Sequence, residues 1–265
     1  MDALKQATFG AVYVVFDDDR WFRASLESVY DECDVILILI ADAPWNGPTR
    51  STESSLACVE SFPDPFKKIH LFRGSWKTET EQRNEGLRRL GQLGIDYCLV
   101  VDADEVYDTL QLRRMMIFAS CMPEIDCWHI SIVTYWKSPQ WRIDPPEPFQ
   151  PQVLLRVGRA RFVQNRYAKG DQHVQIPPHV AVMHHLSYAR SDEEVWTKIH
   201  SFSHAAEVKP DWFERVWKAW DLDHSIQNLN PAYPGAYLRA VEQDPSALPP
   251  VLKKLCGSEI KDRGP

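Results

Sequence analysis

Residues 96–105 read Asp96-Tyr97-Cys98-Leu99-Val100-Val101-Asp102-Ala103-Asp104-Glu105, a short apolar run that ends abruptly in three carboxylates. The apolar part, residues 98–101, is too short for a helix, so we expect a buried strand. Asp102 and Asp104 then fall at the C-terminal end of this strand, which is the edge where open α/β sheets bind ligands. In an extended chain, two carboxylates two residues apart point to the same side.

A hard divalent cation would satisfy this pair of carboxylates, because burying an ionised carboxylate without a partner is very costly. Mg²⁺ and Mn²⁺ bind through one or two carboxylates together with phosphate oxygens. The stretch therefore predicts a metal that holds a phosphorylated ligand. The alternative is a solvated strand end with an acidic turn, and the context of the stretch has to decide between the two.

The whole chain has the composition of an ordinary globular protein. Its 265 residues are 44% hydrophobic and 25% charged, which suits one large domain with or without an extension. The net charge of −7 gives no support for a nucleic-acid partner, which requires a basic face. The six cysteines form no Cys-x-x-Cys pair, a pattern typical of reduced thiols. We expect a cytoplasmic protein without a leader or a transmembrane segment.

Strands and helices alternate through the first half of the chain. The apolar patterns predict strands at residues 9–16, 34–40, 68–72 and 98–101, and helices at 21–30, 51–62 and 78–93. This alternation predicts an α/β fold with a mainly parallel sheet that helices cover on both faces. Asp17, Asp42 and Asp102 follow three of the strands, so we expect them at the same edge of that sheet.

The second half is less regular. The patterns predict, in order, a helix at 110–120, a strand at 127–136, a loop at 138–152, a hairpin formed by 153–157 and 160–163, a strand at 180–185, and a helical stretch at 192–220. Ser191 is the candidate N-cap of the last stretch, because acidic residues follow it. After residue 228 the many prolines indicate short helices and loops.

Three segments together resemble the GT-A glycosyltransferases, in particular family two and related putative glycosyltransferases. The first is the opening strand, which ends in acidic residues. The second is Gln82-Arg83-Asn84-Glu85-Gly86 in a helix just before the apolar strand that ends in Asp102-Ala103-Asp104-Glu105. The third is Met183-His184-His185-Leu186-Ser187-Tyr188-Ala189-Arg190. The resemblance covers the first 110 residues well and residues 125–205 more loosely. It implies a GT-A, Rossmann-like catalytic domain at 1–190, with a nucleotide-sugar-binding half at 1–109 and an acceptor half at 110–190. Residues 191–265 would then form a C-terminal helical extension packed on this domain.

The resemblance also implies roles for individual residues. Asp17, Arg83, Asn84, Asp102 and Ala103 would lie at the nucleotide sugar, with Arg83 at the diphosphate. The metal ligands would be Asp102, Asp104 and a late histidine.

His185 is our choice for that histidine and His184 the alternative, because adjacent strand residues face opposite ways. Asp42 would recognise the base of the donor. The segment Ala41-Asp42-Ala43-Pro44 departs from the Asp-Asp-Gly-Ser that family two has at this place, so the base stays open.

The general base has three candidates on the acceptor side. An inverting transfer needs a carboxylate that takes a proton from the acceptor hydroxyl. Asp171 is the first choice, because it lies beside Gly170 in a loop before the last strand, where the family usually places the base. Asp144 and Glu147 are the alternatives.

Several other side chains could either bind a ligand or metal or simply be packed or solvated. Trp136, Trp141 and Phe149 are candidates for stacking on a sugar, although packing is the commoner role of an aromatic side chain. Lys198 and His204 could serve the diphosphate. The spacing of His200 and His204 could bind zinc, but a packed or solvated histidine is the more frequent case.

The sequence thus predicts an inverting, metal-dependent glycosyltransferase that uses Mn²⁺ or Mg²⁺. It would move a sugar from a nucleotide sugar to a hydroxyl of a glycan, a small metabolite or a modified base. A nucleotidyltransferase is an alternative, although that class would want a glycine-rich, basic loop after the first strand. A second alternative is a non-catalytic protein that binds a nucleotide sugar or a carbohydrate.

Overall fold

Strands that are buried along their whole length form the centre of the molecule. The computed structural model describes residues 6–17, 20–45, 51–200 and 205–262. Every residue of β1 (Phe9–Val15), β2 (Val35–Ala41) and β4 (Tyr97–Val101) is buried. Such continuous apolar runs are typical of parallel strands that are covered on both faces. β1 pairs in parallel with β2 and β4, and β2 pairs in parallel with β3 (Ile69–Gly74).

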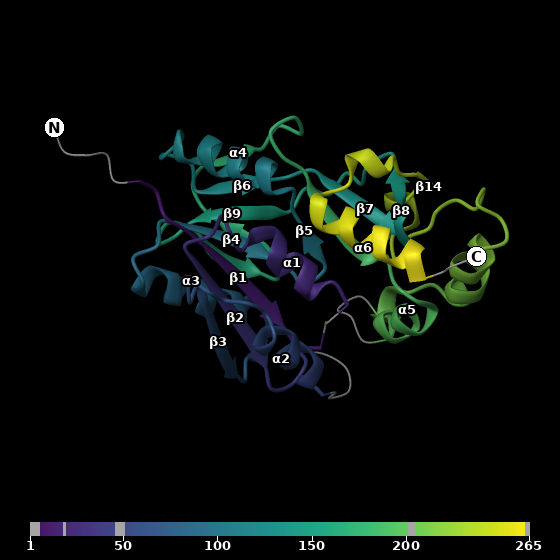
Figure 1. Cartoon of the computed structure of the whole chain (residues 1–265), viewed down its shortest axis with the longest axis horizontal. Coiled ribbons are helices and arrows are strands. Elements are labelled where there is room, and N and C mark those ends of the chain that lie inside the picture. The colour runs from purple at the N-terminus through teal and green to yellow at the C-terminus, as the bar shows by residue number, and fades with distance from the viewer. Residues whose placement is uncertain (1–5, 18–19, 46–50, 201–204, 263–265) are drawn as a thin grey trace.

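These strands belong to a mixed, mainly parallel sheet of seven, in the order β12-β6-β9-β4-β1-β2-β3. β9 (Gln152–Arg156) runs antiparallel to both β4 and β6 (Cys127–His129), and β12 (His173–Gln175) runs parallel to β6. With helices on both faces, this is the GT-A, Rossmann-like class of fold that the sequence predicts, and that prediction is confirmed (Figure 1).

Two separate apolar clusters cover the two faces of this sheet. On one face lie α1 (Phe22–Val29), α2 (Glu53–Glu60) and α4 (Thr109–Ser120). On the other lie α3 (Glu79–Gln92) and the hairpin of β10 (Arg161–Gln164) and β11 (Tyr167–Lys169). Gly86 lets α3 come close to β1, since a Cβ there would lie 2.4 Å from a methyl carbon of Val12.

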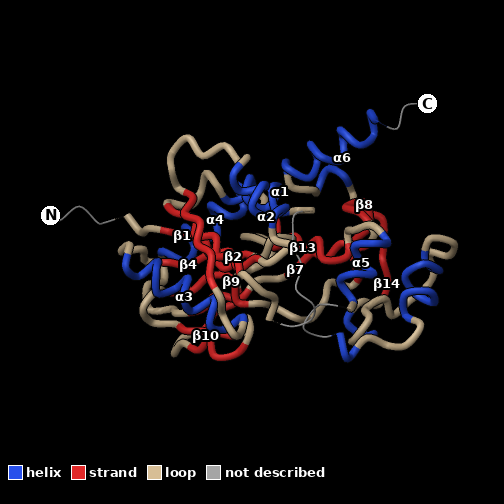
Figure 2. Tube along the Cα trace, turned by 90° about the horizontal axis from the view of Figure 1, so that it is seen from below, coloured by secondary structure: helices blue, strands red, loops and turns tan. Residues whose placement is uncertain are grey.

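A second sheet lies beside the first, in the order β14-β8-β7-β13-β5 (Figure 2). Its strands are β5 (Glu105–Val106), β7 (Ile132–Trp136), β8 (Ser138–Asp144), β13 (Met183–Tyr188) and β14 (Arg239–Glu242). Only residues 102–104 separate β4 of the first sheet from β5 of the second. The acidic stretch therefore lies at the junction of the two sheets.

Three predictions for the second half are wrong in detail. Residues 127–136 form two strands, β6 and β7, which belong to different sheets. Residues 138–144 form strand β8 instead of a loop. The segment 153–157 does not form a hairpin with 160–163, because β9 pairs with β4 and β6 while β10 pairs with β11.

The C-terminal region combines helices with one strand of the second sheet. α5 (Asp192–Ile199) begins at the predicted cap Ser191, and a further helical turn follows at Phe213–Lys218 instead of one continuous helix. Pro210 lies between them, and proline interrupts helices. β14 pairs with β8, so hydrogen bonds join the predicted extension to the predicted catalytic domain. The last helix is α6 (Pro250–Asp262).

Buried aromatic side chains form the core between the second sheet and this C-terminal region. Trp136 of β7 is fully buried, and its ring centroid lies 4.8 Å from that of Trp217. Trp141 packs edge-on against Trp220, at 5.0 Å between centroids. Packing therefore accounts for these tryptophans, and of the three candidates for sugar stacking only Phe149 is an exposed side chain. None of the six cysteines, all within the described residues, forms a disulfide. Among the described helices, none has the length and apolar character needed to cross a membrane.

Candidate functional site

Asp102 lies directly after β4 and is held by two arginines. Its Oδ1 accepts a hydrogen bond of 2.7 Å from Arg83 of α3, and its Oδ2 accepts one of 3.0 Å from Arg166. Desolvation would raise the pKa of Asp102, but the charges of Arg83 and Arg166 outweigh it and lower this pKa. Glu79, one turn earlier on α3, also binds Arg83, at 2.8 Å. Asp102 is thus an ionised carboxylate whose two oxygens both have cationic partners.

Asp104 faces a different group of cations from the C-terminal part of the chain. Its Oδ2 accepts hydrogen bonds from Lys198 of α5 at 3.1 Å and from Arg190 at 3.3 Å. Burial would raise the pKa of Asp104, but the charges of Lys198, His185 and Arg190 hold it far below its ordinary value. The Ser191 capping box fixes the start of α5, and Lys198 lies in the last turn of that helix. Lys198 thus lies at the acidic stretch, and its role at the diphosphate stays a prediction, whereas His204 lies outside the described residues.

Glu105 and Arg166 form a buried ion pair in the site. The side chain of Glu105 is 2% exposed, and both of its oxygens accept hydrogen bonds from the guanidinium of Arg166. One oxygen of Glu105 also accepts the backbone N–H of Asp102 at 3.0 Å. Arg166 lies at the turn of the β10–β11 hairpin, so this hairpin is fastened to the acidic stretch. Sequence reasoning gave Arg166 no role, because its partners lie more than 60 positions earlier in the chain.

The register of β13 decides which histidine reaches the site. His185 pairs with Glu105 of β5 and with Thr134 of β7, and residues paired across strands share one face. Its Nε2 lies 3.7 Å from Oδ1 of Asp104. His184 faces the other way, where its Nδ1 lies 2.8 Å from the hydroxyl of Tyr135. Burial lowers the pKa of His184 to about 4, so this side chain is neutral at pH 7.

We expect the two histidines to respond differently to removal. His185→Ala should weaken metal-dependent binding of a nucleoside diphosphate by about tenfold or more. His184→Ala should leave that binding nearly unchanged and lower the free energy of unfolding by about 2 kcal/mol, because it leaves a cavity and an unpaired hydroxyl. Calorimetric titration in Mg²⁺ and urea unfolding of both variants measure the two effects. A loss of binding in His184→Ala alone would show that the histidines have the opposite roles.

The arrangement of donor atoms fits a metal held by two of the three predicted ligands. Oδ1 of Asp104 and Nε2 of His185 face each other, and a divalent cation commonly takes its remaining ligands from phosphates and water. Both oxygens of Asp102 are bonded to arginines instead. Within the described ranges, no group of three or more His, Cys, Asp or Glu side chains is arranged to hold a metal. Both oxygens of Asp102 thus have cationic partners already, and the pair of Asp104 and His185 is the candidate metal centre.

Among the three candidate bases, Glu147 is the one that bonds to the strand neighbour of His185 in the second sheet. One of its oxygens accepts a hydrogen bond from Thr134, the residue paired with His185. Burial raises the pKa of Tyr188, and the charges of Glu147 and Asp104 both add to this increase. Both carboxylates therefore act electrostatically on the same buried tyrosine.

The other two candidate bases bond to groups outside the acidic stretch. Asp144 forms ion pairs with Arg239 and Arg142 at the outer strands of the second sheet. Asp171 is exposed, and its backbone N–H donates to Asp126, which precedes β6. The backbone of Asp126 bonds to Arg156, the residue paired with Tyr97 at the start of β4.

The length of β4 therefore separates Asp171 from Asp102. Five residues of strand, at about 3.3 Å each, correspond to roughly 17 Å. Asp171 thus lies near the end of the sheet where β4 begins, whereas the acidic stretch follows the end of β4.

The other predicted nucleotide-sugar residues differ in their surroundings. Asp17 follows β1 and Asp42 follows β2, as predicted, and Asp42 is exposed beside Arg73 and Ser75. Ala103 is buried between the two aspartates. The amide of Asn84 makes two hydrogen bonds with the backbone of Phe162, at 2.9 and 3.0 Å. Asn84 therefore joins α3 to β10, and its amide is already engaged.

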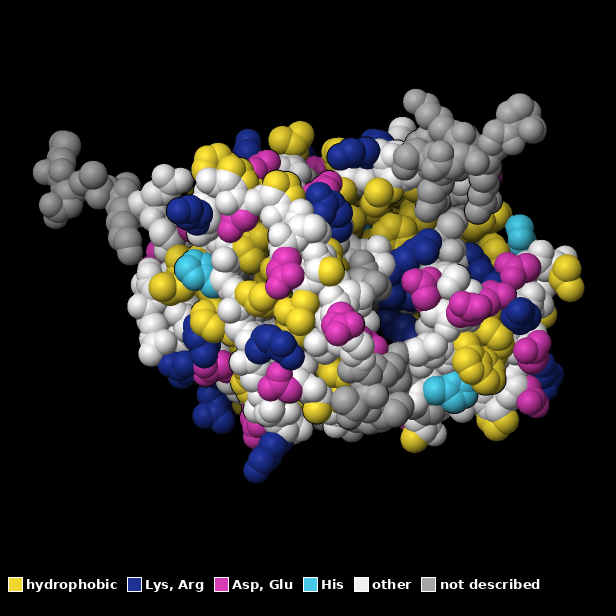
Figure 3. All heavy atoms as spheres, turned by 60° about the horizontal axis from the view of Figure 1, so that its bottom comes forward, with side chains coloured by type: hydrophobic (Ala, Val, Ile, Leu, Met, Phe, Trp, Pro, Cys, Tyr) yellow, Lys and Arg dark blue, Asp and Glu magenta, His cyan; other side chains and the backbone are white. Residues whose placement is uncertain are grey.

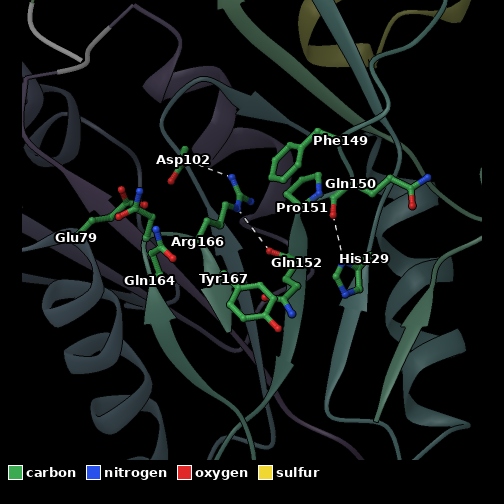
Figure 4. Close-up of a pocket in the computed structure, with 11 residues that line it drawn as sticks. Glu79, Asp102, His129, Phe149, Gln150, Pro151, Gln152, Gln164, Arg166 and Tyr167 are labelled. Atoms are coloured by element: carbon green, nitrogen blue, oxygen red, sulfur yellow. Dashed lines mark hydrogen bonds and ion pairs between the residues drawn. The ribbon is translucent and has the colours of Figure 1, made fainter. Parts of the chain in front are cut away.

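A cavity of about 420 Å³ opens beside Asp102. It lies between the β10–β11 hairpin, the loop that precedes β9, and the start of α3, as Figure 4 shows. Its lining consists of Glu79, Asp102, His129, Phe149, Gln150, Pro151, Gln152, Gln164, Asn165, Arg166 and Tyr167. On the face toward which β1 and β2 point, Lys and Arg side chains gather in a hollow bordered by Asp and Glu side chains (Figure 3).

The fold and the site define an α/β protein of the GT-A class with a charged cluster at the end of its central strand. No family model matches the chain, and no curated protein matches it.

Several solved structures are similar to it. A 4-diphosphocytidyl-2C-methyl-D-erythritol synthase is 14% identical, with a TM-score of 0.40 over 58% of this chain and 76% of that one. The synthase from Anaerococcus prevotii is 11% identical, with a TM-score of 0.37 over 73% and 96%. Residues 1–349 of S. aureus TarS are 14% identical, with a TM-score of 0.42 over 68% and 60%.

Proposed function

We propose that the protein is a metal-dependent glycosyltransferase that moves a sugar from a nucleotide sugar to a hydroxyl acceptor with inversion. The observation that carries this proposal is the arrangement around Asp104 at the end of the central strand. One carboxylate oxygen faces His185, and the other binds Lys198 and Arg190. Such a site combines a place for a metal with fixed positive charges, which is what a departing diphosphate requires.

In this proposal, Asp104 and His185 would hold a Mg²⁺ or Mn²⁺ ion, which would supply Lewis-acid stabilisation of the diphosphate. Lys198 and Arg190 supply further positive charge as the nucleoside diphosphate leaves. Arg83 keeps Asp102 and α3 together beneath the phosphates. Asp17 and Asp42, at the same sheet edge, contact the nucleoside, and the identity of its base stays open.

Glu147 is the base that the geometry supports in place of Asp171. It takes the proton from the acceptor hydroxyl while the oxygen attacks the anomeric carbon. Thr134, which donates to one oxygen of Glu147, orients the carboxylate so that the other oxygen can accept that proton. A base that acts only in the transition state should affect turnover without affecting donor binding.

Glu147→Gln should therefore reduce turnover by about 10²-fold while the affinity for the donor stays unchanged. Asp171→Asn is the matched control, because it neutralises an exposed carboxylate near the start of β4 and should retain full turnover. Steady-state kinetics with the donor and acceptor varied separately measures both. If Asp171→Asn is inactive and Glu147→Gln is not, this assignment of the base is wrong.

The test of the proposal is to incubate the purified protein with a set of nucleotide sugars and Mg²⁺ and to identify the products. Release of a nucleoside diphosphate supports glycosyl transfer, with water as acceptor when no other is added. Release of pyrophosphate from a nucleoside triphosphate supports nucleotidyl transfer instead. That alternative has less support from the residues, since the chain that follows β1 is acidic at Asp17 instead of basic.

A further inference from the structure

The cavity beside Asp102 contains two aromatic side chains that the donor and metal residues do not need. Phe149 is 60% exposed and Tyr167 is 57% exposed, and both line the cavity. They come from different elements, Phe149 from the loop before β9 and Tyr167 from the start of β11 (Figure 4). Aromatic side chains exposed in a concave site are typical of ligand binding.

The polar lining of the cavity consists mainly of amides. The side chains of Gln150, Gln164 and Asn165 make no hydrogen bond with any residue of the described ranges. Gln152, in contrast, binds both the N–H and the C=O of Ala168 and so holds β9 against β11. An amide can both donate and accept hydrogen bonds, as a hydroxyl does. The three amides therefore match a ligand that carries several hydroxyl groups.

The acidic side chains and the arginine of the lining already have partners of opposite charge. Glu79 and Asp102 both bind Arg83. All three guanidinium nitrogens of Arg166 are engaged, with Gln152, Asp102, Glu105 and the carbonyl of Val100. An anionic ligand would meet no unengaged lysine or arginine among the described lining residues. The cavity suits an uncharged ligand.

We propose that this cavity is the acceptor subsite and that it binds an uncharged saccharide. A sugar ring stacks on Tyr167 or Phe149, and its hydroxyls bond to the amides of Gln150, Gln164 and Asn165. The volume of about 420 Å³ lies within the range of small-molecule pockets, about 300–1,000 Å³.

The identification of the saccharide as the acceptor rests on the proposed glycosyl transfer. The loop that carries Phe149 also carries Glu147, two residues earlier, so an acceptor hydroxyl would lie near the proposed base.

Saturation-transfer difference NMR on the whole protein tests this inference without any turnover. The compounds are the methyl glycosides of glucose, galactose, mannose and N-acetylglucosamine, with glucuronate and uridine for comparison. At least one neutral methyl glycoside should receive saturation, and Tyr167→Ala and Phe149→Ala should each reduce its affinity by about fivefold. Phe66→Ala is the matched control, because Phe66 is a 70% exposed aromatic residue that lies outside the cavity lining. It should have no effect.

Two results would overturn the inference. One is stronger Tyr167-dependent saturation of uridine or glucuronate than of every neutral glycoside. The other is that no neutral glycoside gives a signal that depends on Tyr167 or Phe149. Nucleotide-sugar hydrolysis, measured separately, distinguishes the two proposals. If hydrolysis occurs without glycoside binding, only the subsite is wrong. If glycosides bind while no nucleotide sugar is consumed, the saccharide site stands, but the glycosyl transfer and the acceptor role that rests on it are wrong.

Discussion

Asp104→Asn should reduce consumption of the nucleotide sugar by about 10³-fold at saturating Mg²⁺. The substitution removes the charge that faces His185 and leaves the volume of the side chain nearly unchanged. It also removes the charged partner of Lys198 and Arg190, so each of these cations loses an ion pair that orients it. Loss of one preorganised charged group at a reacting centre typically costs factors of about 10²–10³. Initial rates of nucleoside diphosphate release measure the effect.

Asp144→Asn is the matched control for this variant. Asp144 also binds two cations, Arg142 and Arg239, but at the outer strands of the second sheet. The control should keep wild-type turnover, and circular dichroism should show that both variants are folded. Wild-type rates in folded Asp104→Asn would contradict the role given to Asp104.

Arg166→Met should lower the free energy of unfolding by about 3–5 kcal/mol at pH 7. The substitution keeps much of the apolar length of the side chain but removes the cation that binds Glu105, whose carboxylate is almost completely buried. Removing one partner of a buried ion pair leaves an uncompensated charge, which typically costs this amount. Urea unfolding at pH 7 measures the change.

Two further variants separate the ion pair from other effects of the substitution. Arg161→Met replaces an exposed arginine of the same hairpin and should change the free energy of unfolding by less than about 0.5 kcal/mol. Adding Glu105→Gln to Arg166→Met should restore part of the loss, because the buried charge is then removed. If the double variant is less stable than Arg166→Met alone, the cost does not come from the unpaired carboxylate.

The central strands could be predicted because their sequences determine them locally. β1, β2 and β4 are continuous apolar runs bounded by charged or turn residues, and the structure has all three within one or two residues of the prediction. Strand alternation also showed that only one of His184 and His185 could face the acidic stretch. The structure places His185 beside Asp104 and His184 beside Tyr135.

The remaining features depend on partners that are distant in the sequence. The pattern of residues 153–163 resembles a hairpin, but β9 is paired with β4 and β6 because a fully buried central sheet needs a neighbour on that side of β4. Asp171 is connected to β9 through Asp126, so the pairing of β9 with β4 also places Asp171 near the start of β4. Sequence analysis gave Arg166 and Arg190 no role, since a basic residue shows its function only when its carboxylate partner is known.

The most direct test of the central claim is the identity of the phosphorus product. The protein is incubated with a set of nucleotide sugars and Mg²⁺, and ³¹P NMR follows the reaction. Glycosyl transfer breaks the bond between the anomeric carbon and the oxygen of the diphosphate, so the account predicts that a nucleoside diphosphate accumulates and that Asp104→Asn prevents it. Accumulation of a nucleoside monophosphate with a sugar phosphate, or no consumption of any nucleotide sugar, would contradict the account.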